Sequence, residues 1–240
     1  MKIKKEDYNK GYLILINQTH PYKETPINLT KYSKTFSNID LETEALHYLK
    51  KLLKKIKAKE EIIPISGYRT EEEQRKLFNH SLHENGEVYT RKFVAFPNTS
   101  EHQTGLAIDL GKNMPNIDFI CPSFPHDGIC EKFRKLASDY GFIERYTEEK
   151  KDITKISKEE WHFRYISYPH SKIIQDLQFC LEEYIEYLKQ FTYPFNPLKK
   201  YGFKIFFLPA HEEEIELEIT QEFQISGNNE DGFIITMKEE

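Results

Sequence analysis

Residues 100–109 read SEHQTGLAID and place a histidine and an aspartate seven positions apart around a glycine. Asp109 stands between Ile108 and Leu110, in a segment whose apolar residues favour burial. A buried carboxylate is costly unless it is paired or coordinates a cation. Asp109 therefore needs a partner. His102 by itself is not evidence of a metal site at Asp109, because many of the nine histidines could lie on the surface without a functional role.

A second histidine stands in WHFRYI, residues 161–166. Side chains alternate between the two faces of a strand, so His162 and Arg164 lie on the face opposite Trp161, Phe163 and Tyr165. One face therefore carries a candidate ligand, while the other is aromatic and typical of a core.

His102, Asp109 and His162 together supply two imidazoles and one carboxylate. Such a set leaves one position of a tetrahedral zinc open for water, which is typical of a catalytic rather than a structural site. The alternative is a core aspartate satisfied by two hydrogen-bonded histidines. The long separation between Asp109 and His162 imposes no local constraint, so spacing by itself leaves both interpretations open.

The composition indicates a globular protein and excludes some functions. The 240 residues are 38% hydrophobic and 14% aromatic, enough for a sizeable core. The net charge of −5 gives no overall electrostatic reason to bind nucleic acid or an anionic membrane, so we expect no nucleic-acid partner. The basic run LKKLLKKIKAK, residues 49–59, has apolar residues at helical spacing, which favours the solvated face of an amphipathic helix.

No segment reaches the roughly 18 consecutive apolar residues that cross a bilayer, so we expect no membrane insertion. The chain starts without a recognisable signal peptide, and YLILI near its beginning is too short for one. The three cysteines lack CxxC spacing and are odd in number, which predicts reduced thiols. These features lead us to expect a cytoplasmic protein.

The hydrophobic pattern predicts the elements that must position the candidate residues. In the first half it favours a strand near 12–16, a loop rich in Pro, Thr and Asn, a helix over roughly 40–58 and a strand that ends at Gly67. Thr70 and Glu73 form a capping box that predicts a helix over about 71–80. Arg69 then lies at a strand-to-helix junction, and residues 85–100 form a long loop.

The second half predicts a strand over 105–111, a helix ending at Gly141, two strands over 141–146 and 161–166, and one long helix over 171–191. From residue 201 onward FKIFFL, EIELEI and GFIITM favour a small sheet that packs on the rest of the chain. We therefore predict an α+β fold, in which a small antiparallel sheet with flanking helices holds the candidate zinc site. The domain that carries this candidate site spans residues 1–195, and a strand-rich appendage spans 196–240.

Four stretches carry a family resemblance. They are SGYRTEEEQ at 66–74, FVAFPNTSEHQTGLAIDLG at 93–111, YGFIERY at 140–146 and EEWHFRYISYPH at 159–170. In order and spacing they resemble the zinc D,D-peptidases of the VanY and VanXY kind, which are related to lysostaphin-type enzymes and to the hedgehog signalling domain. The resemblance covers roughly residues 10–175.

The resemblance implies that His102, Asp109 and His162 bind one zinc ion per chain and that Glu159 is the catalytic base. The alternation of side chains along a strand, or strand parity, would instead favour Glu160, because residues two positions apart lie on the same face and Glu160 is two positions from His162. We follow the family and expect the strand to begin only at Trp161. The sequence departs from the family here, because a proline is common in place of Glu160 and a glycine in place of Ser167.

Further roles follow from the same resemblance. Arg69 matches the arginine that points at the scissile carbonyl, although by itself it could form a surface ion pair with the acidic helix start. Gln74, Ser100 and Tyr146 match substrate-binding positions; otherwise they would be a solvated helix residue, a loop cap and a half-buried phenol. We expect a structural or capping role for His170. Five other histidines match no motif and are expected to be solvated: His47, His80, His83, His126 and His211.

The implied function is zinc-dependent hydrolysis of the D-alanyl-D-alanine ends of peptidoglycan precursors, which confers resistance to glycopeptides such as vancomycin. The expected partners are the D-Ala-D-Ala dipeptide and the muramyl-pentapeptide precursor. The alternatives are an L,D-carboxypeptidase or endopeptidase of cell-wall peptides, and a zinc-containing binding module without turnover. We expect substrate length to depend on the shape of the loops around 80–98 and 147–158.

Overall fold

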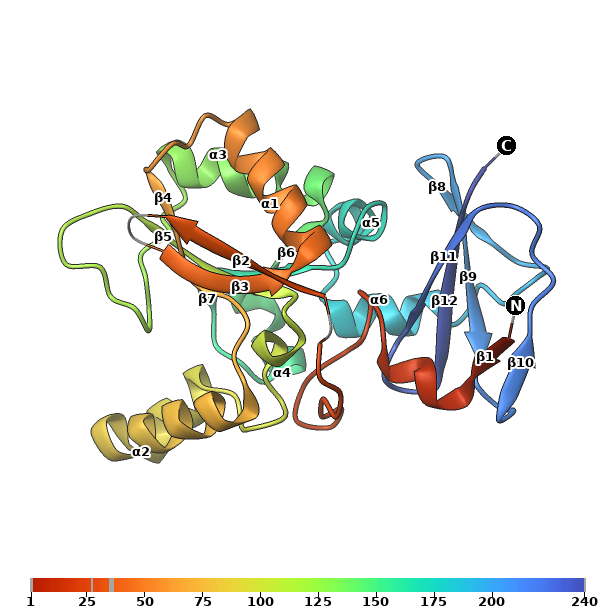
Figure 1. The fold of residues 1–240 in the computed structure, drawn as a ribbon, viewed down its shortest axis with the longest axis horizontal. Coiled ribbons are helices and arrows are strands. Elements are labelled where there is room, and N and C mark those ends of the chain that lie inside the picture. The colour runs from red at the N-terminus through yellow and green to blue at the C-terminus, as the bar shows by residue number, and fades with distance from the viewer. Residues whose placement is uncertain (1, 27, 35–36, 240) are drawn as a thin grey trace.

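The structure is a computed structural model that describes residues 2–26, 28–34 and 37–239. A four-stranded antiparallel sheet forms the centre of its larger lobe (Figure 1). In spatial order, the strands of this sheet are β4 (Ile62–Ser66), β5 (Ala107–Lys112), β7 (Glu159–Tyr165) and β6 (Phe142–Tyr146). The predicted α+β class and the strands around Ile65, Asp109, Arg145 and His162 are confirmed.

Two helices pack on one face of this sheet, α1 (Thr43–Lys55) and α3 (Gly128–Ala137). Their apolar residues share a core with Ile108 and Leu110 of β5 and with Phe163 of β7. The opposite face of β5 and β7 is therefore free to carry Asp109 and His162. The basic residues of α1 point to solvent, as the amphipathic pattern predicts.

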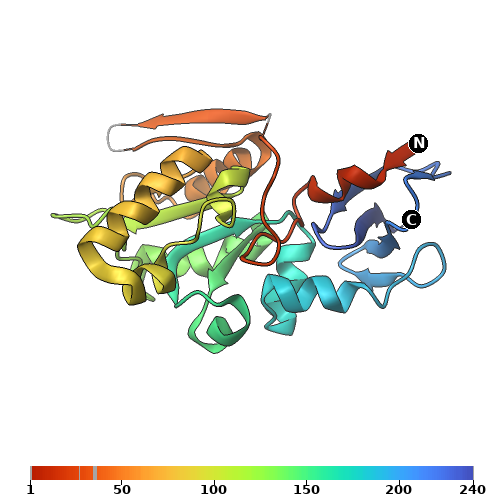
Figure 2. The same ribbon diagram turned by 90° about the horizontal axis from the view of Figure 1, so that it is seen from below.

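A hairpin of β2 (Leu29–Lys34) and β3 (Ser37–Glu42) covers the same core beside α1 (Figure 2). The predicted loop in this region is wrong for these two strands, and its residues 27, 35 and 36 lie outside the described residues. The carbonyl of Asp40 accepts the amide of Tyr68 at 2.6 Å, so the hairpin is tied directly to the segment that follows β4.

Helix α2 (Glu71–Phe93) follows that segment, and its capping box is confirmed, because Thr70 and Glu73 exchange side-chain to backbone hydrogen bonds. The predicted end near residue 80 is wrong. Gly86 has a φ of 78° and breaks the helical geometry, but the helix resumes and ends only at Phe93. A glycine adopts this backbone at little cost, so it interrupted the pattern without ending the element.

The smaller lobe is a second antiparallel sheet at the other end of the molecule (Figure 1). Its strands, in spatial order, are β11 (Phe223–Gly227), β12 (Gly232–Lys238), β9 (Phe203–Pro209) and β8 (Leu198–Lys200). Strand β10 (Glu214–Glu216), from EIELEI, instead pairs with β1 (Lys2–Lys4) at the N-terminus. The beginning of the chain therefore contacts the smaller lobe, and the domain boundary at residue 195 stays a prediction.

Residues 13–16 are buried and Tyr12 is half-buried, but residues 12–16 form no strand, so that prediction is wrong. Their backbone groups bond to other partners: the amide of Leu13 donates to Ser226 Oγ at 2.9 Å and the amide of Leu15 to the carbonyl of Asn228 at 3.0 Å. The guanidinium of Arg164 donates to the carbonyls of Tyr12 and Ile14. The apolar segment predicted to be a strand thus lies between the lobes. Side chains and loops of other elements form the hydrogen bonds to its backbone groups.

Two helices replace the single long helix predicted over 171–191. Helix α5 (His170–Leu177) ends at Gln178, which has a φ of 54°, and α6 (Leu181–Leu188) begins after Cys180. Apolar residues of both helices pack against Ile205 and Phe207 of β9 and Ile234 of β12. The predicted packing of the small sheet on the rest of the chain is confirmed.

Short elements complete the described chain, namely η1 (Lys5–Asn9), η2 (Glu101–Thr104), η3 (Ser138–Tyr140), η4 (Glu148–Lys150) and α4 (Lys151–Thr154). The cysteines Cys121, Cys130 and Cys180 are free thiols. Among the described residues, no helix has both the length and the apolar character needed to cross a membrane.

His170 is buried where the two lobes meet. Its Nδ1 lies 2.8 Å from the hydroxyl of Tyr184, and its Nε2 lies 2.9 Å from Oγ1 of Thr236 in β12. Burial lowers the pKa of His170 to about 3. The structural role expected for His170 therefore consists of joining α5 and α6 to the smaller sheet as a neutral imidazole.

His170 should make stability depend on pH. The unfolded histidine binds a proton below about pH 6.5, whereas the folded one stays neutral down to about pH 3, so its contribution falls as the pH decreases through this window. We expect the free energy of unfolding of metal-free wild type to fall more steeply between pH 7 and 5 than that of His170→Gln, by up to about 1.4 kcal/mol per pH unit. Urea unfolding at several pH values measures this, and parallel slopes would contradict it.

Candidate active site

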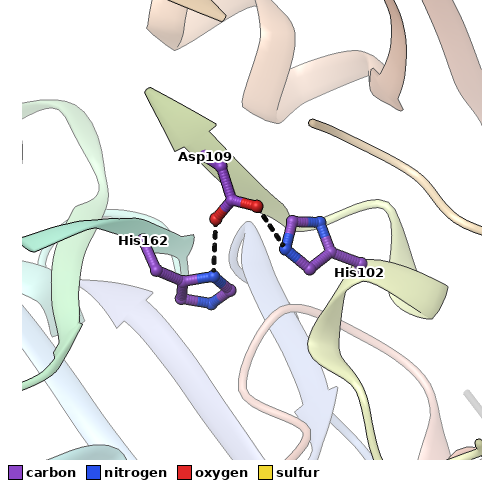
Figure 3. A group of neighbouring side chains, drawn as sticks. All are labelled: His102, Asp109 and His162. Carbon is purple, nitrogen blue, oxygen red and sulfur yellow. Dashed lines mark hydrogen bonds and ion pairs between the residues drawn. The ribbon is translucent and has the colours of Figure 1, made fainter. Parts of the chain in front are cut away.

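Three side chains from separate elements meet on the open face of the larger sheet. His102 comes from η2, Asp109 from β5 and His162 from β7. Asp109 and His162 face each other directly on paired strands. One ligand atom from each of the three residues lies within 4.8 Å of the others (Figure 3). The pairing of β5 with β7 thus brings together two residues that are far apart in the sequence, Asp109 and His162, which their spacing alone could not predict.

Each imidazole turns one nitrogen toward Asp109. His102 Nε2 lies 3.1 Å from one carboxylate oxygen, and His162 Nδ1 lies 2.9 Å from the other (Figure 3). The second ring nitrogen of His102 donates to the carbonyl of Gly67 at 2.7 Å. The second ring nitrogen of His162 lies 3.4 Å from a carboxylate oxygen of Glu101. The protein therefore holds both rings by their outer nitrogens and directs the inner ones at a shared point.

The burial of these groups shifts their protonation equilibria. Burial by itself would raise the pKa of Asp109, but the two histidines hold it well below its usual range. Burial would lower the pKa of His162, but hydrogen bonds to Asp109 and Glu101 raise it to about 10. Burial lowers the pKa of His102 despite the neighbouring Asp109. The carboxylate is therefore ionised and ready to bind a cation.

The donor set fits zinc. Two imidazole nitrogens and one carboxylate oxygen are common ligands of Zn²⁺, and three protein ligands are typical of its catalytic sites. Metal-binding histidines usually donate the other ring N–H to a carboxylate or a backbone carbonyl, and here Glu101 and Gly67 stand at those positions. His102, Asp109 and His162 could thus hold a metal ion without rearranging the outer contacts.

Glu159 and Glu160 differ clearly in their surroundings. Glu159 is 7% exposed, and its Oε2 lies 3.9 Å from His162 Nδ1. Burial raises the pKa of Glu159 to about 8. Glu160 instead accepts the backbone amide of Phe124 on the opposite side.

The expectation that the strand begins only at Trp161 is wrong, because β7 starts at Glu159. Parity nevertheless fails to select Glu160. Glu144 pairs with Phe163, but Tyr146 pairs with Glu159, so the register between β6 and β7 shifts in this stretch. The irregularity breaks the two-residue alternation, and Glu159 faces the same cavity as His162.

Arg69 follows β4, and its guanidinium is held on two sides. It donates to Gln74 Oε1 at 2.7 Å and to Ser66 Oγ at 2.8 Å. The hydrogen bonds of Arg69 therefore go to Gln74 and Ser66 and not to the acidic residues at the start of α2, which was the alternative. Gln74 is itself buried and donates to the carbonyl of Ala95, so it is not a solvated helix residue.

The remaining predicted substrate-binding residues are also buried beside the histidines. The ring of Tyr146 lies 5.0 Å from that of His162, centre to centre. Ser100 is buried and precedes η2, so it stands directly before the turn that presents His102. The five histidines expected to be solvated, at positions 47, 80, 83, 126 and 211, are all exposed.

A single cavity of about 480 Å³ collects every site residue that the sequence suggested. Its lining includes Arg69, Gln74, Ser100, His102, Asp109, Tyr146, Glu159 and His162. Phe119, Ile120 and Trp161 also line it and were not suggested; the two former residues are exposed and lie in the segment after β5.

Three buried charged residues at the cavity were missed as well. Glu101 lines the cavity and forms ion pairs with Arg145 and Arg164, and all three are almost fully buried. Signals for two of them were present, because Glu101 stands next to His102 and strand parity places Arg164 on the face of His162. No local pattern marks Arg145 as the second arginine that pairs with Glu101.

Comparison with known proteins identifies the family. The VanY family model, described as D-alanyl-D-alanine carboxypeptidase, matches residues 38–168. VanXYC of Enterococcus gallinarum, a bifunctional D-Ala-D-Ala dipeptidase and D-Ala-D-Ala carboxypeptidase, is 44% identical over 74% of this chain and 95% of its own length.

Solved structures agree. The vancomycin resistance D,D-dipeptidase VanXYg, in complex with a D-Ala-D-Ala phosphinate analogue, superposes with a TM-score of 0.95 at 44% identity, covering 100% of this chain and 98% of that one. A VanY D,D-pentapeptidase in complex with Zn(II) has a TM-score of 0.60 at 28% identity, covering 72% and 98%. The chain therefore belongs to the VanY family of D-alanyl-D-alanine carboxypeptidases.

Proposed function

We propose that this chain is a zinc-dependent peptidase that hydrolyses the D-alanyl-D-alanine ends of peptidoglycan precursors and so confers resistance to vancomycin. The observation that carries the proposal is the convergence of the His102, Asp109 and His162 cluster, Glu159 and Arg69 on one cavity. The similarity to a bifunctional dipeptidase and carboxypeptidase supports both activities in one site.

One zinc ion per chain would be held by His102 Nε2, a carboxylate oxygen of Asp109 and His162 Nδ1, the atoms that face one another in the cluster. When bound, zinc lowers the pKa of water to about 7 and polarises the scissile carbonyl. Gly67 and Glu101 occupy the outer nitrogens of the two rings, so the inner nitrogens are oriented toward the metal position. Metal binding would displace the proton that His162 carries on its inner nitrogen, because only the deprotonated nitrogen can be a ligand.

Glu159 is the general base in this proposal. Its carboxylate lies at the edge of the cluster, 3.9 Å from His162 Nδ1, and faces the cavity. It takes a proton from the attacking water and later delivers that proton to the amine that leaves. Burial excludes bulk water from this carboxylate, so the proton stays within the site.

Arg69 opposes the negative charge that develops on the carbonyl oxygen. Hydrogen bonds to Gln74 and Ser66 fix its guanidinium before substrate arrives, and a preorganised donor of this kind needs no rearrangement during the reaction. Gln74 thus acts through Arg69, while Ser100 and Tyr146 line the cavity where the substrate binds. A cytoplasmic location, where such precursors would be met, stays a prediction.

The function is tested by product release from three substrates. We expect the purified protein with zinc to release D-alanine from the D-Ala-D-Ala dipeptide and from a precursor pentapeptide ending in D-Ala-D-Ala. A tetrapeptide with an L,D bond at the same place should be cleaved far more slowly. Faster cleavage of the L,D bond would establish the alternative carboxypeptidase, and no cleavage of any substrate would indicate a binding module.

The metal assignment is tested by Asp109→Asn. Loss of the charged ligand should reduce bound zinc from one equivalent per chain to a small fraction of one after dialysis, because the remaining two imidazoles bind zinc weakly. Asp152→Asn, an exposed aspartate in α4, is the matched control and should keep the full equivalent. Elemental analysis measures both. Full zinc content in Asp109→Asn would contradict the assignment.

The base is tested by Glu159→Gln beside Glu160→Gln. Glu159→Gln should lower kcat by on the order of 100-fold to 10,000-fold, the usual effect of losing general base catalysis, while zinc stays bound. Glu160 faces Phe124 rather than the cavity, so its substitution should leave kcat near the wild-type value. Steady-state kinetics with zinc analysis on the same samples decides the matter. The reverse result would make Glu160 the base.

A further inference from the structure

Glu101 is a buried carboxylate that contacts a catalytic-site histidine and two arginines at once. Its side chain is 0% exposed. One oxygen lies 2.8 Å from Arg145 Nε and 3.0 Å from Arg164 Nη1. The other oxygen lies 3.4 Å from His162 Nε2. None of these contacts touches the cavity point shared by His102, Asp109 and His162.

The contacts continue beyond Glu101 to the helix that bears the smaller lobe. Arg145 donates to both carboxylate oxygens of Glu182 in α6, at 2.9 and 2.7 Å. A buried series of alternating charges therefore runs from His162 through Glu101 and Arg145 to Glu182. Arg164 anchors the same carboxylate from the other side and donates to the carbonyls of residues 12 and 14.

The direction of the His162 ring depends on this arrangement. Its Nδ1 faces Asp109 and Glu159, and its Nε2 faces Glu101, so the two nitrogens have different partners. A carboxylate at Nε2 favours a proton on that nitrogen and leaves the lone pair of Nδ1 for a ligand. Arg145 and Arg164 fix the carboxylate itself, since a charge-assisted pair with a guanidinium restricts its rotation.

We propose that Glu101 is a positioning residue, which accepts the Nε2–H of His162, sets the orientation of the ring and thereby determines how tightly the site holds its metal. The inference rests on the proposed function, because it takes His162 as a ligand. The competing explanation is that Glu101 only neutralises two buried arginines. That role would matter for folding but not specifically for metal affinity.

Glu182 separates the two explanations. It is another partner of Arg145 and also largely buried, but it does not contact His162. Glu182→Gln therefore weakens the same charge network without touching the ring, while Glu101→Gln weakens the network and the ring contact together. A purely structural role predicts similar effects of the two substitutions on zinc affinity, and the positioning role predicts different ones.

The experiment measures the zinc Kd by competition with a chelator, together with the Tm of the metal-free proteins. Both variants should lower the Tm. Glu101→Gln should raise the zinc Kd by about 10-fold to 100-fold, as removal of a hydrogen-bond partner of a ligating histidine typically does. Glu182→Gln should leave the Kd close to that of wild type. Equal zinc affinity in all three proteins, or equal losses in both variants, would overturn the proposal.

Nuclear magnetic resonance gives a direct signature of the ring contact. In zinc-loaded protein labelled with ¹⁵N-histidine, the Nε2–H of His162 should give a downfield signal protected from exchange with water. It should move upfield or broaden in Glu101→Gln and stay in place in Glu182→Gln. An unchanged signal in Glu101→Gln would count against the contact.

Two further variants keep the outcome decisive. If Glu101→Gln does not fold, Glu101→Asp retains the charge between the arginines but withdraws the carboxylate from His162, and it should still raise the zinc Kd. His162→Ala tests the underlying proposal: if wild type binds zinc no better than His162→Ala, the assignment of the ligand itself fails. Tight binding that His162→Ala abolishes and the Glu101 variants leave unchanged overturns the positioning role alone.

Discussion

The pairing of Asp109 with two histidines is the constraint on which the rest of the structure depends. A carboxylate between apolar residues in a central strand has a high desolvation cost unless charges or donors face it. The register of β5 on β7 places His162 opposite Asp109, and the turn of η2 brings His102 to its other oxygen. The apolar layer of α1 and α3 fills the opposite face, so the polar residues meet on the face that opens to the cavity.

That polar face needs further charges, because the histidines must themselves be held. Glu101 and Gly67 hold their outer nitrogens, and Glu101 in turn requires Arg145 and Arg164 to remain ionised in a buried position. Burial by itself would raise the pKa of Glu101, but the two arginines hold this pKa well below its usual range. Each buried charge thus has a neighbour of opposite sign, an arrangement in which removing one member leaves another uncompensated. The cluster is therefore part of a network of buried charges and not an isolated group of three side chains.

Local physical signals made much of this predictable from the sequence. The capping box at Thr70, the alternation from His162 to Tyr165 and the helical spacing around Leu52 depend on nearby residues, and the structure agrees with all three. Trp161 departs from the alternation, because it lines the cavity together with His162. The secondary-structure predictions failed where contacts with residues distant in the sequence determine the local conformation. Residues 12–16 have the pattern of a strand, but Arg164 and the loop at Ser226 form the hydrogen bonds to their backbone. The helix predicted over 171–191 is interrupted at Gln178, where no glycine or proline indicates a break.

The choice between Glu159 and Glu160 shows the same limit at the site itself. Strand parity is a local rule and holds only while the ladder is regular, but the register of β7 on β6 shifts between Phe163 and Glu159. Strand β7 pairs with two neighbours here: His162 lies opposite Asp109 of β5, and Glu159 pairs with Tyr146 of β6. An irregular stretch beside a functional residue re-aims a side chain, here the carboxylate of Glu159 toward His162. Residue types indicate which side chains can do chemistry, while the pairing of β7 with its two neighbours decides which of two adjacent carboxylates faces the cavity.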